Sequence, residues 1–446
     1  MKTLIQNVHV VNEGNVFRAD VCIENEMIGG IEQPNTIPTS WADKVIDGSN
    51  LHLMPGMIDD QVHFREPGLT HKGNLFSESR AAVAGGVTSF MEMPNTVPNT
   101  VTLEELEKKY QRGAEVSLAN YSFYIGATQD NVDVIQSIDI KNVCGIKIFM
   151  GSSTGNMLVD NDDSLNAIFK HAKTLIATHC EDDKMIAENF QRIQSQHPDG
   201  IPVSLHPIIR NADACYASSS KAIELAKRHD AQLHILHIST AKEIALFQND
   251  IELKNKRITA EACVHHLWFC DEDYAHLDSR IKWNPAVKSA QDRAAIRQAV
   301  IDGYIDVLAT DHAPHTLLEK GNPYSSCPSG GPLVQHVLVA LLDLYHQGVF
   351  TLEQIVQKAS HNVATLYNIP NRGFIRPGYK ADLVLVDLNQ PWMATDENSR
   401  YLCQWTPFHG HVFKSKIIST LVNGHLAFDQ DQIHDQILGQ QLQFAR

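Results

Sequence analysis

The middle of the chain alternates short apolar runs with longer stretches in which apolar residues recur at helical spacing. The short runs cover residues 51–58, 87–91, 121–125, 143–149, 175–178, 232–238, 257–262 and 304–310. Helical patterns lie between them, such as residues 103–112, 165–172, 213–229 and 291–301. Buried parallel strands read as continuous apolar runs and are joined by helices. Eight such strands over about 310 residues predict an α/β protein with a (β/α)8 barrel of the TIM type.

Both ends of the chain read instead as short strands separated by turns. Residues 4–11, 21–24, 27–31 and 45–46 are strand-like, and Asp47-Gly48 is a turn signal. Near the other end, residues 381–387 form an apolar run, and Asn423-Gly424 between two such runs predicts a hairpin. We therefore predict a barrel over residues 52–365 and a small β-sandwich built from residues 1–51 and 366–446.

Composition and charge narrow the classes of partner. Hydrophobic residues make up 43% of the 446 residues and charged residues 20%, as in an ordinary globular protein. The net charge of −15 argues against nucleic acid or an anionic membrane surface as a partner, because both need a basic face. The longest apolar stretch, around residues 337–342, is far shorter than the roughly 18 residues of a membrane span. A small-molecule substrate, even an anionic one, remains compatible with this charge.

The cysteines and the first residues indicate the compartment. The eight cysteines are scattered and form no CxxC pair, which is typical of small buried residues in a reducing cytosol. Residues 1–7 contain no uninterrupted apolar segment of the kind that a secretory signal needs. We expect a soluble, cytoplasmic protein.

Several predicted strands end in, or contain, side chains that bind metal ions. These residues are His63, Lys147, His179, His237 and Asp311. The carboxyl ends of barrel strands meet at one rim, so five such strands would bring their side chains together. Imidazole combined with carboxylate is a zinc-type ligand set. We therefore predict a zinc site at this rim.

A single histidine is more often structural than a ligand, and the chain has 23 of them. His234 lies three residues before His237, and His265-His266 follows the seventh strand. These histidines are therefore local alternatives as metal ligands. We rank His237 first because it lies nearer the end of its strand, beside Ser239-Thr240.

Lys147 and Asp311 carry the candidate chemistry. Burial inside an apolar strand lowers the pKa of a lysine, so Lys147 is either paired with a buried carboxylate or a neutral amine that takes up carbon dioxide. The carbamate formed in the second case can bridge two metal ions. Asp311 can hold a metal and also accept a proton from its bound water. The sequence contains no GxGxxG or GxxxxGK loop, which argues against a nucleotide-phosphate site.

Six motifs in order along the chain resemble the amidohydrolase superfamily, and within it the dihydroorotase family. They are Pro55-Gly56-Met57-Ile58-Asp59, His63-Phe64-Arg65-Glu66-Pro67-Gly68, Met93-Pro94-Asn95-Thr96, His237-Ile238-Ser239, Thr310-Asp311-His312-Ala313-Pro314-His315 and Pro377-Gly378-Tyr379-Lys380-Ala381-Asp382-Leu383. The resemblance implies reversible, zinc-dependent cyclisation of N-carbamoyl-L-aspartate to dihydroorotate in pyrimidine biosynthesis.

The same resemblance assigns roles to individual residues. One or two zinc ions would be held by His63, carboxylated Lys147, His179, His237 and Asp311, with Asp311 as the catalytic proton carrier. Substrate would be bound by Arg65, Asn95, Asn284, His315 and the backbone near Gly330. Arg65 is the most informative of these, because its fork of donors suits a substrate carboxylate. Independently of the resemblance, the length and position of residues 320–331 after the eighth strand favour an active-site loop over a plain connection.

The chain departs from the family pattern at Gln61, where the first His of a His-x-His motif is usual. An amide oxygen is a much poorer zinc ligand than imidazole, so the metal position built on His63 is expected to be weak, water-filled or empty. Asn284-Pro285-Ala286-Val287-Lys288 and Gln335 also differ from the usual residues. The remaining ligand-type residues predict at least one metal.

Two other functions stay open at this point. Another cyclic-amide hydrolase, of the hydantoinase or allantoinase type, is argued against by Arg65 and Asn95. A catalytically silent subunit that supports a partner such as aspartate transcarbamoylase is favoured only by Gln61. A homodimer is usual for enzymes of this kind.

Overall fold

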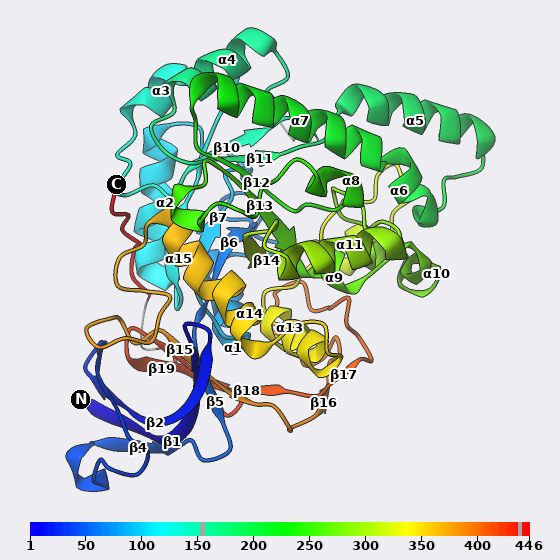
Figure 1. Cartoon of the computed structure of the whole chain (residues 1–446). Helices are drawn as coiled ribbons and strands as arrows, with labels where there is room; N and C mark the ends of the chain where they lie inside the picture. Colours follow the sequence, from blue (N-terminus) through cyan, green and yellow to red (C-terminus); the bar gives the residue numbers. More distant parts are fainter. Residues whose placement is uncertain (152–156, 436–438) are drawn as a thin grey trace.

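The computed structural model describes residues 1–151, 157–435 and 439–446. Figure 1 shows strands surrounded by helices in one part of the molecule, with the strands from both ends of the chain gathered beside them. The predicted α/β architecture of a barrel with a separate β domain is confirmed.

The barrel consists of one sheet of order β6-β7-β8 and a second of order β14-β13-β12-β11-β10-β9, all parallel. The strands are β6 (Met57–Val62), β7 (Val87–Glu92), β8 (Asn120–Phe123), β9 (Ile125–Gly126), β10 (Ile146–Phe149), β11 (Ile176–His179), β12 (Leu233–Ile235), β13 (Ile258–Cys263) and β14 (Val307–Ala309). Strands β8 and β9 are successive parts of one barrel position. A parallel bridge between Val62 and His312 closes the ring, where the His63 N–H donates to the His312 carbonyl at 2.7 Å. The eight predicted strand positions are therefore present.

The first predicted strand, residues 51–58, is wrong in its extent. It divides at Gly56 into β5 (His52–Pro55), which pairs with β1 and β15 of the β domain, and β6 of the barrel. A side chain at Gly56 would lie 2.1 Å from the Thr88 Cγ2 atom. Only glycine therefore fits at this position, where the chain crosses from the β domain into the barrel. Both halves are apolar because both are buried, and the apolar pattern therefore could not reveal the break.

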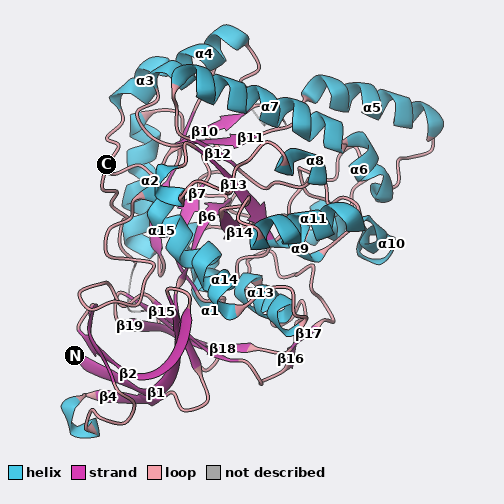
Figure 2. Ribbon diagram, viewed as in Figure 1, coloured by secondary structure: helices cyan, strands magenta, loops and turns pink. Residues whose placement is uncertain are grey.

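Helices cover the outside of the barrel (Figure 2). The four predicted helices are confirmed with small shifts at their ends, as α2 (Leu103–Val116), α4 (Asp162–His171), α7 (Ala212–His229) and α11 (Ala290–Ile301). Thr102, Asn211 and Ser289 each accept a backbone hydrogen bond from the first turn, which fixes three of these helix starts. The other α-helices are α1 (Leu75–Ala84), α3 (Val132–Ser137), α5 (Asp183–Gln196), α6 (His206–Ile209), α8 (Ala241–Ile244), α9 (Val264–Trp268), α10 (Tyr274–Leu277), α12 (Leu317–Lys320), α13 (Val337–His346), α14 (Leu352–Val356) and α15 (Asn362–Tyr367).

The β domain is built on one sheet of order β20-β19-β18-β15-β5-β1-β2-β3, with β4 paired to β1. Its strands are β1 (Lys2–Asn12), β2 (Asn15–Glu24), β3 (Met27–Glu32), β4 (Lys44–Asp47), β5, β15 (Leu383–Asp387), β18 (Lys416–Val422), β19 (His425–Asp429) and β20 (Gln432–Ile433). The sheet encloses a core that includes Val10, Val21 and Leu385. The predicted hairpin is present, with Asn423 and Gly424 at φ of 50° and 76° between β18 and β19.

A small hairpin-like sheet of β16 (Trp392–Met393) and β17 (Val412–Phe413) lies apart from the main sheet. Residues 439–446 run along the barrel at the beginnings of its strands, where the Tyr121 N–H donates to Gln440 and the Leu442 N–H donates to Tyr121. Among the described residues, no helix combines the length and the apolar character needed to cross a lipid bilayer.

Candidate active site

A cavity of about 390 Å³ opens at the carboxyl ends of the barrel strands. It is lined by every residue for which the sequence predicted a role: Gln61, His63, Arg65, Asn95, Lys147, His179, His237, Asn284, Asp311, His315 and Gly330. These residues come from most of the barrel strands and from the loops that follow them. The predicted convergence at one rim is therefore present.

Three of these residues have a left-handed backbone. Arg65, His237 and Asp311 have φ of 73°, 41° and 51°, which is uncommon for residues other than glycine. Each lies two or three residues after the end of a barrel strand, where the chain leaves the sheet. Such strain is retained where the surrounding structure requires a particular side-chain direction, and here it accompanies side chains that face one cavity.

His179 and His237 form the first close pair of donors. The His179 Nδ1 and His237 Nε2 atoms lie 3.1 Å apart, and the other ring nitrogen of His179 is 2.9 Å from a Glu181 oxygen. Arg210 contacts the same carboxylate at 2.5 Å. A carboxylate behind a histidine holds the ring orientation that a metal ligand needs. Burial keeps the pKa of His237 well below its ordinary value, so the ring is neutral and able to bind a metal.

Glu181 and Arg210 were not predicted from the sequence. The sequence carries a local pattern that could have indicated Glu181, but none that could have indicated Arg210. Glu181 follows His179 in a His-x-Glu pattern on the same strand end, whereas Arg210 lies after helix α6 and only the fold brings it near.

His63 and Asp311 form the second pair. The His63 Nε2 atom is 3.2 Å from an Asp311 oxygen, and the opposite ring nitrogen is 2.7 Å from the Asn95 amide oxygen. Because that oxygen accepts a hydrogen bond from Nδ1–H, the Nε2 lone pair faces Asp311. Burial raises the pKa of Asp311 to about 7, although Lys147 and His179 oppose the rise. The carboxyl group is therefore suited to both taking and giving a proton near neutral pH.

Gln61 contacts Asp311 through its nitrogen. Its Nε2 donates to the same Asp311 oxygen at 3.1 Å, and its Oε1 atom accepts a weak bond from the Cys263 thiol at 3.6 Å. In this orientation Gln61 acts as a hydrogen-bond donor that holds Asp311 in place.

Lys147 is buried in β10, with its Nζ atom 4.6 Å from the centre of the Phe149 ring. Burial lowers its pKa to about 8, while Asp311 and Glu261 act in the opposite direction. A lowered pKa makes the neutral amine accessible near neutral pH, as carbamate formation requires.

The opposite wall of the cavity is rich in donors. Arg65 donates to the Pro314 carbonyl at 3.0 Å, and its terminal nitrogen lies 3.0 Å from the His315 Nε2 atom. Lys72, which the sequence analysis missed, lies 3.0 Å from the other nitrogen of His315 and also lines the cavity. The buried Asn284 Oδ1 atom has no hydrogen-bond partner within the described part of the chain. This wall fits a ligand that carries a carboxylate and an N–H group.

The loop over residues 320–331 forms part of the wall, as predicted, through Pro328, Ser329 and Gly330. Gly330 has φ of 120°, and a side chain there would lie 2.6 Å from the Ala313 carbonyl. The buried Lys320 ammonium holds the loop, with bonds to the carbonyls of Pro328 at 3.0 Å and Gly330 at 2.9 Å.

The alternative histidines lie elsewhere. His234 is inside the barrel, His265 stacks on Trp283 with ring centres 4.6 Å apart, and neither they nor His266 line the cavity. His237, which we ranked first, is the one that faces it.

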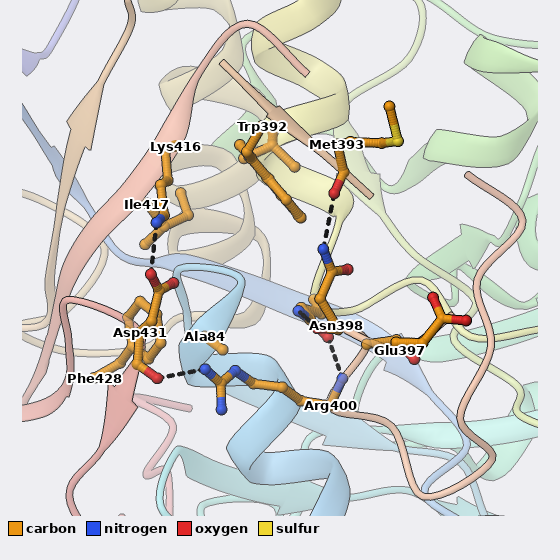
Figure 3. Close-up of a pocket in the computed structure, with 13 residues that line it drawn as sticks. Ala84, Trp392, Met393, Glu397, Asn398, Arg400, Lys416, Ile417, Phe428 and Asp431 are labelled. Carbon is orange, nitrogen blue, oxygen red and sulfur yellow. Dashed lines mark hydrogen bonds and ion pairs between the residues drawn. The ribbon is translucent and has the colours of Figure 1, made fainter. Parts of the chain in front are cut away.

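A second cavity, of about 460 Å³, lies between the barrel and the β domain (Figure 3). None of the predicted site residues lines it, and its cations are already paired: Lys416 lies 2.6 Å from the Asp431 carboxylate, and Arg400 donates to the Asp431 carbonyl. Gln335 faces this cavity, where its amide oxygen accepts from the Arg400 N–H at 2.6 Å. Gln335 therefore stabilises the surface segment around Arg400 and does not belong to the candidate active site.

Comparison with known proteins agrees with the motifs. The amidohydrolase family matches residues 52–427. A dihydroorotase of Halobacterium salinarum is 33% identical over 387 residues, which cover 86% of this chain and 88% of that protein. A dihydroorotase of Methanosphaera stadtmanae is 29% identical, over 93% of this chain and 94% of that protein.

Among solved structures, an L-hydantoinase (dihydropyrimidinase) from Arthrobacter aurescens has a TM-score of 0.93 at 22% identity, over 99% of each chain. A dihydropyrimidinase from Brevibacillus agri has a TM-score of 0.89 at 23% identity, over 100% of each chain. At these identities the likeness is one of fold.

Proposed function

Because the chain belongs to the amidohydrolase family and is a cyclic amide hydrolase, we propose that it is a dihydroorotase, which interconverts N-carbamoyl-L-aspartate and dihydroorotate. The observation that carries the proposal is Arg65, buried in the wall of the cavity beside His315. Burial lowers the pKa of Arg65 to about 10, which leaves it charged at neutral pH. A charged group in such a place favours an anionic ligand, and dihydroorotate carries a ring carboxylate.

The residues at the strand ends fit a zinc-type metal. The donor atoms of His179 and His237 are 3.1 Å apart, close to the roughly 3.4 Å that separates two donors on one tetrahedral zinc ion. Two further groups, Glu181 and Asn95, orient imidazoles in the way that ligands are oriented. We infer that one or two zinc ions are held by His63, carboxylated Lys147, His179, His237 and Asp311. When bound, zinc would supply Lewis acidity and a water molecule of lowered pKa.

The chain's own residues then account for binding and proton transfer. Arg65, Lys72 and His315 hold the carboxylate, and Asn95 and Asn284 orient the ring. In hydrolysis, Asp311 takes the proton of the water that attacks the ring carbonyl carbon. It passes this proton to the ring nitrogen as the carbon–nitrogen bond breaks. In the biosynthetic direction the same proton moves back and water leaves.

Two other functions are tested against this proposal. Hydantoinases share the fold of this chain, but a hydantoin needs no Arg65. Gln61 supports a silent subunit, such as one that assists aspartate transcarbamoylase, but the other ligand-type residues are all present at the cavity. A homodimer of the active enzyme remains our expectation.

Turnover of dihydroorotate, N-carbamoyl-L-aspartate, hydantoin and allantoin by the purified protein tests the proposal. The metal content is measured in the same samples before and after chelation. We expect turnover of the first two compounds only, lost on chelation and restored by zinc. Preferential hydrolysis of hydantoin would establish the second function, and no turnover by zinc-loaded protein would establish the third.

The substitution Gln61→His should increase the metal content. It replaces an amide that donates to Asp311 by an imidazole next to His63 and thereby completes a two-histidine motif. We expect up to one additional equivalent of zinc per chain, measured by elemental analysis after dialysis against a fixed free zinc concentration. Gln335→His, in the cavity of Figure 3, is the matched control and should leave the zinc content unchanged. Equal zinc in the parent protein and in Gln61→His would show that position 61 does not limit metal binding.

The substitution Lys320→Met should weaken substrate binding. It removes the bonds that tie Pro328 and Gly330 to the wall, at about 0.5–1.5 kcal/mol for each hydrogen bond. We expect KM for dihydroorotate to rise about tenfold, with a smaller effect on kcat. Lys358→Met removes another buried lysine that bonds a carbonyl away from the cavity, at Ile305, and should leave KM unchanged. Similar KM values in both variants would contradict a role of Lys320 in holding the loop.

A further inference from the structure

Beneath the candidate active site, the barrel contains a second group of metal-binding side chains. Asp60 on β6, His234 on β12 and Glu261 on β13 are each completely buried. One donor atom from each lies within 4.8 Å of the other two, and the described part of the chain contains no other such group of three. None of the three lines the cavity.

Each of these side chains is fixed through one atom and leaves another without a partner. The Tyr367 hydroxyl donates to the Asp60 Oδ2 atom at 2.9 Å, and the His237 N–H donates to the Glu261 Oε1 atom at 2.9 Å. By contrast, Asp60 Oδ1, Glu261 Oε2 and His234 Nε2 have no hydrogen-bond partner among the residues that the structure describes. Buried polar atoms are nearly always partnered, so one unpartnered atom on each of three neighbouring side chains calls for an occupant.

The orientation of His234 indicates what that occupant is. Its Nδ1 atom lies 2.8 Å from the Thr259 hydroxyl, which itself points its hydrogen at the Leu233 carbonyl. The hydroxyl therefore accepts a hydrogen bond from the Nδ1–H group, and this leaves a lone pair on Nε2. That lone pair faces two carboxylates, an arrangement that is repulsive unless a cation lies between them.

We propose that Asp60, His234 and Glu261 bind a divalent metal ion of the zinc type inside the barrel, separate from the metal site at the cavity. The Nε2 atom is 3.3 Å from Asp60 Oδ2, the oxygen that also accepts from Tyr367, and 3.8 Å from Glu261 Oε2. Donors on one tetrahedral zinc ion lie about 3.4 Å apart. The second ring nitrogen of a coordinating histidine usually donates to a hydrogen-bond acceptor, and the Thr259 hydroxyl serves as that acceptor for His234.

A proton on His234 is the competing occupant. Burial alone lowers the pKa of His234, but Asp60 and Glu261 outweigh it and raise the pKa to about 9. Ion-paired hydrogen bonds, however, are about 2.7–2.9 Å long, which is shorter than either distance measured here. A proton would also balance only one of the two carboxylates, whereas a divalent ion with a neutral imidazole balances both.

The ion would stiffen the floor of the cavity. Glu261 would keep one oxygen on the His237 backbone, next to a side chain that faces the cavity. The same oxygen accepts from the Cys263 thiol at 3.1 Å, and that thiol also contacts Gln61. The site therefore lies directly under two residues of the candidate active site, but its formation requires no turnover.

Anomalous diffraction from crystals of the full chain, grown with Zn²⁺, locates the ion directly. We expect a zinc peak about 2.0–2.2 Å from donor atoms of Asp60, His234 and Glu261. This result is independent of any peak at the cavity and of any activity. If the map shows zinc at the cavity but no zinc between these three side chains, the proposal is overturned. A protonated His234 would then explain the arrangement.

Metal content after dialysis gives a second, independent readout. Asp60→Asn and Glu261→Gln keep the side-chain size but remove a charged ligand, and each should lose about one equivalent of zinc relative to the parent. Tyr367→Phe removes only the hydroxyl that supports Asp60 and should retain the zinc. Full zinc in Asp60→Asn would overturn the proposal. If the charge variants are insoluble, the anomalous map of the parent protein still decides.

Discussion

Replacing Asp311 by asparagine should lower kcat for dihydroorotate by about 10²- to 10⁴-fold, the usual contribution of a positioned acid–base group. The amide keeps the shape of the side chain and can keep one hydrogen bond, but it cannot accept the proton of the attacking water. Because burial raises the pKa of Asp311 to about 7, the carboxyl group can transfer this proton in both directions of the reaction. Steady-state kinetics in both directions measures the effect, which should be equal in each.

The controls for this variant separate proton transfer from metal loss. The zinc content of Asp311→Asn is determined together with kcat, because Asp311 is also an expected ligand. Asp343→Asn alters another buried aspartate, paired at 3.0 Å with His411 and distant from the cavity, and should leave kcat unchanged. Turnover by Asp311→Asn at the parental rate would exclude the assigned role.

Replacing Arg65 by glutamine should raise KM for dihydroorotate by about 10- to 100-fold. Hydrogen bonds to charged groups contribute about 1.5–3 kcal/mol, and the variant loses the charge that faces the substrate carboxylate. The variant should also lose selectivity, because a hydantoin has no carboxylate for Arg65 to bind. The ratio of kcat/KM for dihydroorotate to that for hydantoin measures this change and should fall.

Arg65→Lys distinguishes geometry from charge. A lysine retains the positive charge but cannot present two parallel donors, so its KM should lie between those of the parent and the glutamine variant. Equal KM values for all three proteins would mean that Arg65 does not bind the substrate carboxylate, and the proposal of a dihydroorotase would lose its main support.

Much of the fold follows from the chain pattern, and the exception has a physical cause. Buried parallel strands and their capped helices leave strong local signals, as at β10 and α11. The division of residues 51–58 at Gly56 left no such signal, since both halves are buried among apolar neighbours. The crowding of Gly56 against Thr88 is visible only in the folded structure.

The site could be predicted where its residues end strands, and not where they come from other elements. His179, His237 and Asp311 follow apolar runs and were therefore visible. Arg210 reaches the site through Glu181 from a distant helix, which no spacing reveals.

Asp60 was hidden for a different reason. The pairing of β6 with β7 shifts register between Asp59 and Val62, so the simple alternation of inward and outward side chains does not hold there. The sequence could not indicate that Asp60 and Gln61 both contact residues inside the barrel.

The crossing at Gly56 also determines how the molecule can open. The chain passes from the β domain into the barrel at this residue. The Gly56 N–H donates to the Asp382 carbonyl at 2.9 Å, and Thr88 leaves no space beside it. A junction this tight cannot serve as a hinge, so the units should not swing apart to admit a ligand. Entry and release must depend on local movements at the mouth of the barrel, and heating should melt both units in one cooperative transition.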